Sequence, residues 1–383
     1  MFAEQIFTNA RIVLPDQVIR GTLLLRGGTI AEVSDTRSHA PGALDFEGDT
    51  LIPGIVDLHT DNLERQVQPR PAARWPSRSA LLAHDAQTAA AGVTTVFDAL
   101  CVGDIHPAGN RRRTFTDGAA DLAALAPTGA LKCDHFLHIR CELPAHDMLP
   151  LLEEVVDHPL LRLASLMDHC PGVGQFSDVE RFRRMLLSEG FDAAGADRRI
   201  REMLALRAEN AEPNRAALLA RLGDRVPLAA HDDWDAAEIR RNSADGIRIS
   251  EFPVSLAAAE AARREGMTVI VGAPNLVRGG SHSGNVAART LVEAGLADAI
   301  ASDYVPPAML EAAWKLALDP EIGLARAVAM VTANPAAMAG LSDRGRIAVG
   351  LRADLVRVRP LPDPLNGELA VPRAVWRAAE RVA

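Results

Sequence analysis

Residues 54–62, GIVDLHTDN, open on an apolar run and close on polar side chains. The run at Ile55 and Val56 is typical of a buried strand, and the chain turns polar where that strand should end. His59 and Asp61 are two residues apart, so on an extended chain both side chains point to the same side. We therefore predict a buried strand whose tip presents an imidazole beside a carboxylate.

The same pattern, a short apolar run with a polar tip, recurs along the middle of the chain and alternates with helical patterns. One such helix is predicted at residues 77–91, with Gly92 just past its end. Strands alternating with helices predict an α/β fold, here a (β/α)8 TIM-like barrel. The eight predicted strands lie at residues 51–59, 92–100, 135–143, 161–169, 226–233, 246–254, 266–275 and 298–306.

The two ends of the chain have a different pattern. Residues 1–52 and 341–383 alternate apolar and polar positions, which predicts small antiparallel β units on either side of a barrel at 53–340. Residues from about 177 to 223 are charged, rich in helical patterns and too long for an ordinary connection. We predict that this segment is a helical insertion on the rim of the barrel.

Composition narrows the class of protein. The 383 residues are 48% hydrophobic, and no apolar stretch reaches membrane-spanning length. A net charge of −9 argues against a nucleic-acid surface. Four cysteines without a CxxC pair, and an N-terminus without a signal-peptide pattern, favour a cytoplasmic protein with reduced thiols. We expect a small-molecule substrate, no nucleic acid and no membrane partner; a homo-oligomer is compatible with the sequence.

Metal-competent side chains fall at the predicted C-terminal strand ends, where barrel enzymes build their active sites. Any one of them alone is more often a hydrogen-bonded or surface residue, but their recurrence at equivalent positions favours a metal site. Imidazole and carboxylate ligands suit a divalent ion, with zinc favoured over manganese or iron. Six ligands exceed the needs of one tetrahedral ion, so we predict two metals per chain with Glu142 as the bridge. The predicted ligands are His59, Asp61, Glu142, His169, His231 and Asp303. His138, on the same strand face as Glu142, could line the barrel or be a ligand, and lining is the preferred interpretation.

A second pattern suggests phosphate binding. Residues 272–295, GAPNLVRGGSHSGNVAARTLVEAG, read as a strand end, a glycine-rich loop and a helix. Converging backbone N–H groups and a helix N-terminus favour an anion. The predicted substrate-binding residues here are Arg278, Ser281, His282, Ser283 and Asn285. The alternative is a glycine-rich turn in which Ser283 or Asn285 only caps the helix.

The loop after the first strand is rich in arginine. Guanidinium groups match phosphate oxygens, so Arg65 and Arg70 are added as candidate substrate-binding residues. Arg74 and Arg78 belong to the same loop. The alternative is a solvated basic loop without a ligand.

These motifs together resemble the amidohydrolase superfamily. The resemblance rests on LIPGIVDLHTD, on a late strand that ends in Asp303, and on GRIAVGLRADLV near the C-terminus. HTDNLE and GAPNLVRGGSHSGN resemble, more narrowly, the branch of that superfamily that serves the carbon–phosphorus lyase pathway of phosphonate use. The resemblance implies that both chain ends fold into one small β-sandwich domain. Most members carry His-x-His on the first strand, whereas this chain has His59-x-Asp61.

The activity that this resemblance implies is a phosphoric anhydride hydrolysis, in which α-D-ribose 1-methylphosphonate 5-triphosphate gives the 5-phosphate and pyrophosphate. The implied mechanism is metal-assisted, with Asp303 as a metal ligand that also accepts or relays the proton of water. One alternative is a cyclic amidase or deaminase on the same barrel. Another is a non-catalytic subunit of a pathway complex, which predicts lost ligands, although all six candidates are present.

Overall fold

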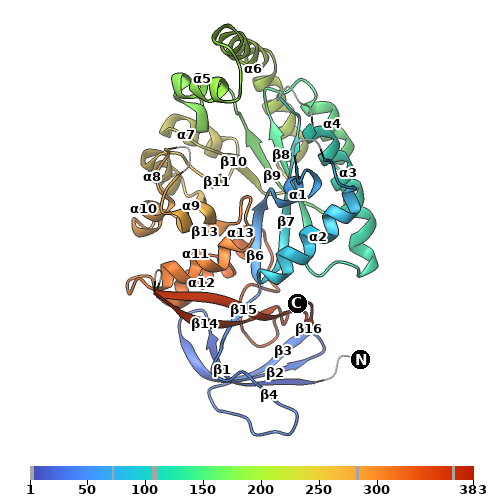
Figure 1. Cartoon of the computed structure of the whole chain (residues 1–383), viewed down its shortest axis with the longest axis vertical. Helices are drawn as coiled ribbons and strands as arrows, with labels where there is room; N and C mark the ends of the chain where they lie inside the picture. Colours follow the sequence, from blue (N-terminus) through green and yellow to red (C-terminus); the bar gives the residue numbers. More distant parts are fainter. Residues whose placement is uncertain (1–3, 71–72, 106–109, 282–283, 365–366) are drawn as a thin grey trace.

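The structure, a computed structural model, describes residues 4–70, 73–105, 110–281, 284–364 and 367–383. Its central feature is a sheet of eight parallel strands, each paired with the next in the chain (Figure 1). An isolated parallel bridge between Thr60 and Asp303 joins the last strand to the first, so the sheet is a nearly closed barrel. The predicted fold class is confirmed. The strands are β6 (Ile55–Thr60), β7 (Val93–Val102), β8 (Asp134–Glu142), β9 (Leu161–Met167), β10 (Leu228–His231), β11 (Ile249–Glu251), β12 (Thr268–Gly272) and β13 (Ala299–Ala301).

Helices connect these strands and cover the outside of the barrel. The predicted helix at 77–91 is α2 (Ser77–Ala90), and Gly92 follows it with a φ of 96°. None of the helices in the described ranges is both long enough and apolar enough to span a membrane. The other connecting helices are α1 (Asn62–Val67), α3 (Asn110–Leu125), α4 (Met148–Val155), α7 (Ala236–Ala244), α8 (Leu256–Arg264), α9 (Ala273–Arg278), α10 (Ala288–Glu293), α11 (Ala308–Ala317), α12 (Gly323–Ala329) and α13 (Ala333–Met338), with short 3₁₀ turns η1 (Ala126–Thr128) and η2 (Gly174–Phe176).

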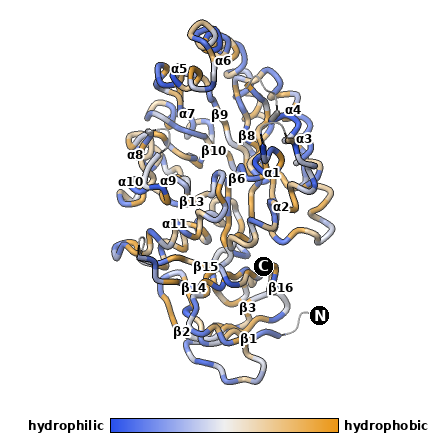
Figure 2. The backbone as a smooth tube through the Cα atoms, viewed as in Figure 1, coloured by the Kyte–Doolittle hydropathy of each residue, from blue (hydrophilic) through white to orange (hydrophobic). Residues whose placement is uncertain are grey.

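Apolar side chains fill the inside of the barrel. Val56 and Leu58 of β6 meet Phe97 of β7 and Leu163 of β9 in one buried cluster. A larger apolar cluster lies between the strands and the surrounding helices. Figure 2 shows hydrophobic residues recurring along both the strands and the helices. Because the interior is packed rather than hollow, polar groups of the strands are available for chemistry only at the strand ends.

The two chain ends form a separate eight-stranded sheet, at the pole where both termini lie (Figure 1). Most of its pairings are antiparallel, and its core contains the packed rings of Phe7, Phe46 and Trp376. The prediction that both ends build one small β unit is confirmed. Its strands are β1 (Gln5–Val13), β2 (Val18–Arg26), β3 (Thr29–Ser34), β4 (Leu44–Asp45), β5 (Thr50–Pro53), β14 (Leu355–Asp363), β15 (Gly367–Arg377) and β16 (Glu380–Arg381).

The first predicted strand, at 51–59, is in fact two. β5 belongs to the end sheet and β6 to the barrel, and Gly54 separates them. A Cβ atom at Gly54 would lie 2.2 Å from Thr94 Oγ1, so only glycine lets the chain pass so close to β7. Because the apolar run is continuous across Gly54, the sequence gives no sign that the chain passes from one sheet to the other here.

The predicted insertion is helical. It consists of α5 (Val179–Ser188) and α6 (Ala193–Leu222), at the pole opposite the end sheet (Figure 1). The side chains of Asp178 and Asp192 accept hydrogen bonds from the first turns of these two helices, as N-cap residues do. The insertion therefore has its own start signals and is an ordered part of the rim.

A buried polar network fixes α2 to the barrel. The carboxylate of Asp98 on β7 lies 2.7 Å from His84 Nε2 and 2.7 Å from His135 Nδ1. His135 Nε2 lies 3.1 Å from Asp85 Oδ1 on α2. Burial alone lowers the pKa of His135, but the two carboxylates outweigh it and raise that pKa to about 9. His135 is therefore a buried cation between two anions.

This network makes part of the stability depend on pH. The unfolded histidine has a pKa of about 6.5, so the raised folded value stabilises the fold fully below about pH 6.5. That contribution is lost as the pH rises through about 9. Chemical unfolding should show that the free energy of unfolding of wild type exceeds that of His135→Gln by an amount that falls over this pH range. The fall should be up to about 3 kcal/mol, since one pKa unit corresponds to about 1.4 kcal/mol. His39→Gln, at an exposed position, is the matched control; a gap for His135→Gln that does not change with pH would contradict the charged state.

Candidate metal centre

The predicted metal ligands converge on one rim of the barrel. Atoms of His59, Asp61 and Asp303 that can bind a metal all lie within 4.8 Å of one another. This first group joins the tip of β6 to the residue that follows β13. Two hydrogen bonds hold the tips together: the Asp61 N–H donates to the Asp303 carbonyl oxygen at 2.6 Å, and the Asp303 N–H to the His59 carbonyl oxygen at 3.0 Å.

A second group lies beside the first. His169, His231 and Asp232 also offer ligand atoms within 4.8 Å of one another. The ring centres of His59 and His231 are 5.4 Å apart, and those of His169 and His231 are 5.7 Å apart. The two groups are thus neighbours in one site, as a pair of metal ions requires.

Glu142 lies against His169. Its Oε2 is 2.5 Å from His169 Nδ1, and its Oε1 accepts the His169 backbone N–H at 3.0 Å. Burial raises the pKa of Glu142, but the neighbouring imidazole outweighs burial and lowers it. Glu142 is in none of the three-residue groups of the described residues that could hold a metal, so its bridging role stays a prediction.

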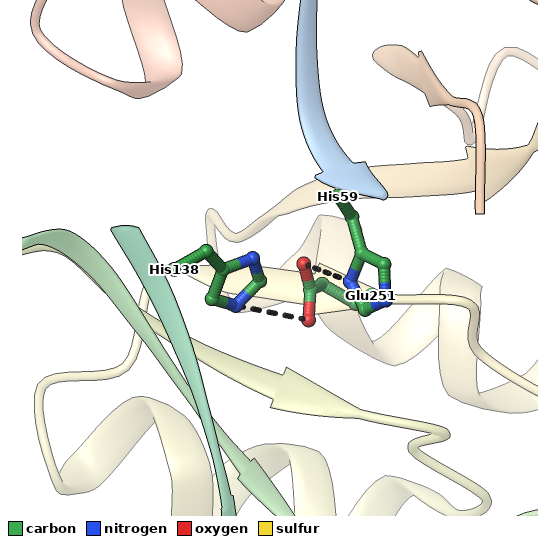
Figure 3. Close-up of side chains that lie close together, drawn as sticks. All are labelled: His59, His138 and Glu251. Atoms are coloured by element: carbon green, nitrogen blue, oxygen red, sulfur yellow. Dashed lines mark hydrogen bonds and ion pairs between the residues drawn. The ribbon is translucent and has the colours of Figure 1, made fainter. Parts of the chain in front are cut away.

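Three residues of the site were not predicted as ligands: His138, Asp232 and Glu251. Glu251 ends β11, and its Oε1 lies 3.2 Å from His59 Nδ1, while its Oε2 lies 4.0 Å from His138 Nε2 (Figure 3). The position of Glu251 at the end of the sixth predicted strand was a usable signal. His138 was expected to line the barrel, and it does so, contacting the Leu58 carbonyl and the Ser165 hydroxyl.

Buried polar atoms without hydrogen-bond partners support a metal at this site. Among the described side chains, His59 Nε2, His231 Nδ1 and Glu251 Oε2 are buried and lack such a partner. An unpaired buried polar atom is costly, and metal coordination is one way to satisfy it. The donor set of imidazoles and carboxylates fits a divalent cation.

Arg140 brings a positive charge into the site from β8. Its guanidinium is buried and lies 2.5 Å from Asp61 Oδ1. Burial raises the pKa of Asp61, but Arg140 and His59 outweigh it and hold that pKa well below its usual range. A carboxylate has two oxygens, so this ion pair leaves Asp61 Oδ2 for a metal.

Asp303 is a carboxyl group suited to proton transfer. Burial, together with the charge of Asp61, raises the pKa of Asp303 to about 7, against the opposing effect of His59 and Arg140. A group that changes protonation near neutral pH suits general acid–base catalysis. The pKa values of Asp61 and Asp303 are therefore shifted in opposite directions although the two residues are adjacent.

Backbone strain collects at the same rim. Asp232, Phe252 and Asp303 have positive φ values of 60°, 55° and 56°, and each follows the end of a barrel strand. Non-glycine residues rarely adopt this conformation, and where they do it is often at functional sites. Here it turns the chain sharply so that the strand tips stay at the cavity.

These residues open into a cavity of about 1120 Å³. Among the predicted phosphate-binding residues, Arg278, Ser281 and Asn285 line it. His282 and Ser283 lie outside the described residues. Arg65 and Arg70 are not among the lining residues, and their part in substrate binding stays a prediction.

The rest of the arginine-rich loop is structural. Arg74 pairs with Asp117 and Arg78 with Asp121, so both arginines join this segment to α3. A basic loop in the sequence thus becomes, in the fold, a set of ion pairs with a neighbouring helix.

The predicted cradle needs a correction. The strand does end at Gly272, but residues 273–278 form the short helix α9 instead of a loop. The following helix, α10, begins at Ala288 with Ala287 as its N-cap, so Asn285 is not the cap. The glycine-rich sequence masked α9, although Pro274 at its first turn is compatible with a helix start.

Comparisons with known proteins agree with this geometry. A sequence profile described as the amidohydrolase family matches residues 180–380. The chain belongs to the amidohydrolase family. It is 41% identical, over 381 residues, to the alpha-D-ribose 1-methylphosphonate 5-triphosphate diphosphatase of Escherichia coli (strain K12), covering 98% of this chain and 100% of that protein.

Solved structures of other enzymes share the fold. A D-hydantoinase has a TM-score of 0.62 at 15% identity, covering 99% of this chain and 95% of its own. The N-acetyl-D-glucosamine-6-phosphate deacetylase of Mycobacterium smegmatis has a TM-score of 0.63 at 16% identity, covering 99% and 100%. At such low identity these amidohydrolase structures support the fold alone.

The geometry suggests that Glu251 orients the metal ligand His59. A carboxylate on the far nitrogen of a metal-binding imidazole fixes the ring and raises its basicity. We expect Glu251→Gln to weaken binding of divalent metal about 10- to 100-fold, the usual cost of losing such a partner. Titration of metal-free protein with zinc in a calorimeter measures this loss of zinc affinity.

Glu238→Gln is the matched control, because Glu238 accepts the Trp234 N–H and is in none of the candidate metal groups of the described residues. Equal zinc affinity of wild type and Glu251→Gln would rule out the orienting role.

Proposed function

We propose that this enzyme hydrolyses α-D-ribose 1-methylphosphonate 5-triphosphate to the 5-phosphate and pyrophosphate in phosphonate catabolism. The observation that carries the proposal is the 41% identity to the Escherichia coli diphosphatase over the full length of that protein. The rim of the barrel supports it, because it combines a candidate two-metal site with cationic side chains in one cavity.

The proposed cofactor is a pair of divalent ions, with zinc favoured. His59, Asp61 and Asp303 would hold one, and His169, His231 and Asp232 the other. When bound, such ions lower the pKa of water and neutralise charge on phosphoryl oxygens. Glu142 remains the proposed bridge.

Side chains of the protein are proposed to transfer the proton and to stabilise the charge on the phosphoryl groups. Asp303 is proposed to accept or relay a proton, because its carboxyl group lies beside His59 and Asp61 at the proposed metal site. Arg140 and Arg111 line the cavity near the ligands, and Arg278 lines it beside Ser281 and Asn285. Fixed cations of this kind stabilise charge that develops on a phosphoryl group and on leaving pyrophosphate.

The two alternatives are less well supported. A cyclic amidase or deaminase would fit the fold, as the D-hydantoinase shows, but it has no need of several arginines in the cavity. A non-catalytic subunit would be expected to lose ligands, whereas all six predicted ligands lie on the rim of the barrel. A cytoplasmic location is proposed with the function, since all four cysteines are free and buried.

Release of pyrophosphate tests the proposal directly. Metal-loaded wild type should release pyrophosphate from the ribose phosphonate triphosphate, and Asp303→Asn should reduce turnover at least about a hundredfold, the lower range for a positioned general base. Asp224→Asn, at an exposed position, is the control. Ammonia release from an amide or amine substrate without any pyrophosphate would favour the deaminase alternative, and near-normal turnover of Asp303→Asn would remove its catalytic role.

Arg278 is the described residue that best tests the phosphate site. Arg278→Gln should lower kcat/KM for the triphosphate about ten- to a hundredfold, as expected for losing a hydrogen bond to a charged group. Metal content, measured by elemental analysis, should stay the same. The control is Arg289→Gln, whose arginine pairs with Glu293 on the surface of α10. A parallel fall in metal content would show instead that the substitution disturbs the metal site.

A further inference from the structure

The long helix of the insertion, α6, carries polar side chains on the face that it packs against the barrel. Positions 207, 214 and 215 fall on one side of this helix, because seven residues span about two turns. Asn214 and Arg215 are buried there, beside the apolar residues Leu218 and Leu222. Buried polar groups need hydrogen-bond partners, and those of α6 lead to loops of the barrel rim.

Asn214 holds the loop that follows β8. Its side-chain amide donates to the carbonyl oxygens of Leu143, at 2.7 Å, and of Ala145, at 2.9 Å. Leu143 comes directly after Glu142, and the Ala145 N–H donates to the Glu142 carbonyl oxygen at 3.0 Å. One amide group of α6 therefore fixes the turn that follows the candidate ligand Glu142.

Arg207 holds the loop that follows β9. Its Nε donates to Asp168 Oδ2 at 2.5 Å, and Asp168 Oδ1 accepts the Cys170 N–H at 3.1 Å. An Asp side chain that accepts a backbone N–H two residues further on sets a local turn. The residue inside this turn is the candidate ligand His169. Arg207 therefore fixes the carboxylate that shapes the turn around His169.

Arg215 reaches the loop that follows β10 through a chain of hydrogen bonds. Its Nη2 donates to Asn242 Oδ1 on α7 at 2.7 Å, and Asn242 Nδ2 donates to Asp233 Oδ1 at 2.7 Å. Asp233 is fully buried. It follows directly after the candidate ligands His231 and Asp232. The position of this loop is thus tied to α6 as well.

These three contacts serve one of the two candidate metal groups. The loops after β8, β9 and β10 carry the proposed bridge Glu142 and the second group, His169, His231 and Asp232. The first group, on β6 and after β13, is held by the two backbone hydrogen bonds between those strand tips. The two groups therefore have separate supports, and α6 belongs to the support of the second.

We propose that α6 positions the ligands of the second metal ion, with Arg207, Asn214 and Arg215 as positioning residues, so that the helical insertion sets the affinity for that ion. This inference rests on the two-metal part of the proposed function and deepens it. Ligands that are already held in place lose less freedom when they bind. Removal of the groups that support metal ligands typically lowers metal affinity ten- to a hundredfold.

Titration of the metal-free enzyme with zinc in a calorimeter tests this role. Wild type should bind two ions, and Arg207→Gln should weaken one binding step about tenfold or more and leave the other unchanged. Arg207 is 42% exposed, so its replacement leaves no buried cavity. Arg207→Lys keeps a cation within reach of Asp168 and should restore most of the lost affinity.

The matched control is Arg221→Gln. Arg221 lies on the same helix and makes a comparably exposed ion pair, but its partner Glu153 is on α4 instead of a ligand loop. Both zinc affinities of this variant should equal those of wild type. Asn214→Leu, which removes the amide donor at similar volume, should show the same selective loss as Arg207→Gln; should it fail to fold, Arg207→Gln decides.

A second background identifies the ion that is affected. His231→Ala removes a ligand of the second group and should leave one binding step. In that background Arg207→Gln should have no further effect, because the site that it supports is already lost. A further loss of affinity there would overturn the inference, as would equal affinities of wild type and Arg207→Gln, or two steps that weaken together.

The outcome for the proposed function is separate. Pyrophosphate release by metal-loaded wild type is measured alongside, and its absence would overturn the proposed function whatever the zinc titrations show. Binding of a single zinc ion by wild type would overturn the inference, together with the two-metal proposal, even where pyrophosphate is released.

Discussion

Closure of the barrel between β13 and β6 is the constraint on which the site depends. The two backbone hydrogen bonds that link Asp303 with His59 and Asp61 tie the last strand to the first. They also bring together ligand candidates from opposite ends of the barrel sequence. Since parallel strands of a closed barrel all end on one rim, this closure places the remaining candidates on the same side. The positive φ of Asp303 is the local strain that accompanies this arrangement.

Closure also concentrates negative charge, and the fold compensates for it. Glu142 and Glu251 are buried and Asp61 is half-buried within a small volume, where unpaired carboxylates would be costly. Arg140 pairs with Asp61, His169 with Glu142 and His59 with Glu251. Each carboxylate thus has one cationic or imidazole partner from another strand. At Asp303, burial and the charge of Asp61 instead raise the pKa of the carboxyl group to about 7.

A feature of this fold or site could be predicted from the sequence when its signal lies in neighbouring residues. The eight strands were predictable because each has its own apolar run, and the positions of the candidate ligands followed because each adjoins such a run, as His59 and Asp61 do; their role as ligands stays a prediction. Glu251 was missed as a partner because its contact is to His59, on a strand far away in the sequence. Arg74 and Arg78 had no local sign of their carboxylate partners on α3. Pairings across elements depend on the packing of helices on strands, which a single sequence does not encode locally.

The protonation of His59 links this compensation to metal binding. Burial lowers its pKa, but Glu251 and Asp61 outweigh burial and raise it to about 10, so the metal-free ring is a cation. An imidazole that binds a metal must be neutral, and a divalent ion at Nε2 would supply the positive charge that the proton supplies without it. Glu251 keeps its contact with Nδ1 in either case, because both the imidazolium and the metal-bound imidazole can donate there. The same arrangement of His59, Glu251 and Asp61 thus holds the ring in the metal-free protein, and a metal at the proposed site would compete with the proton for Nε2.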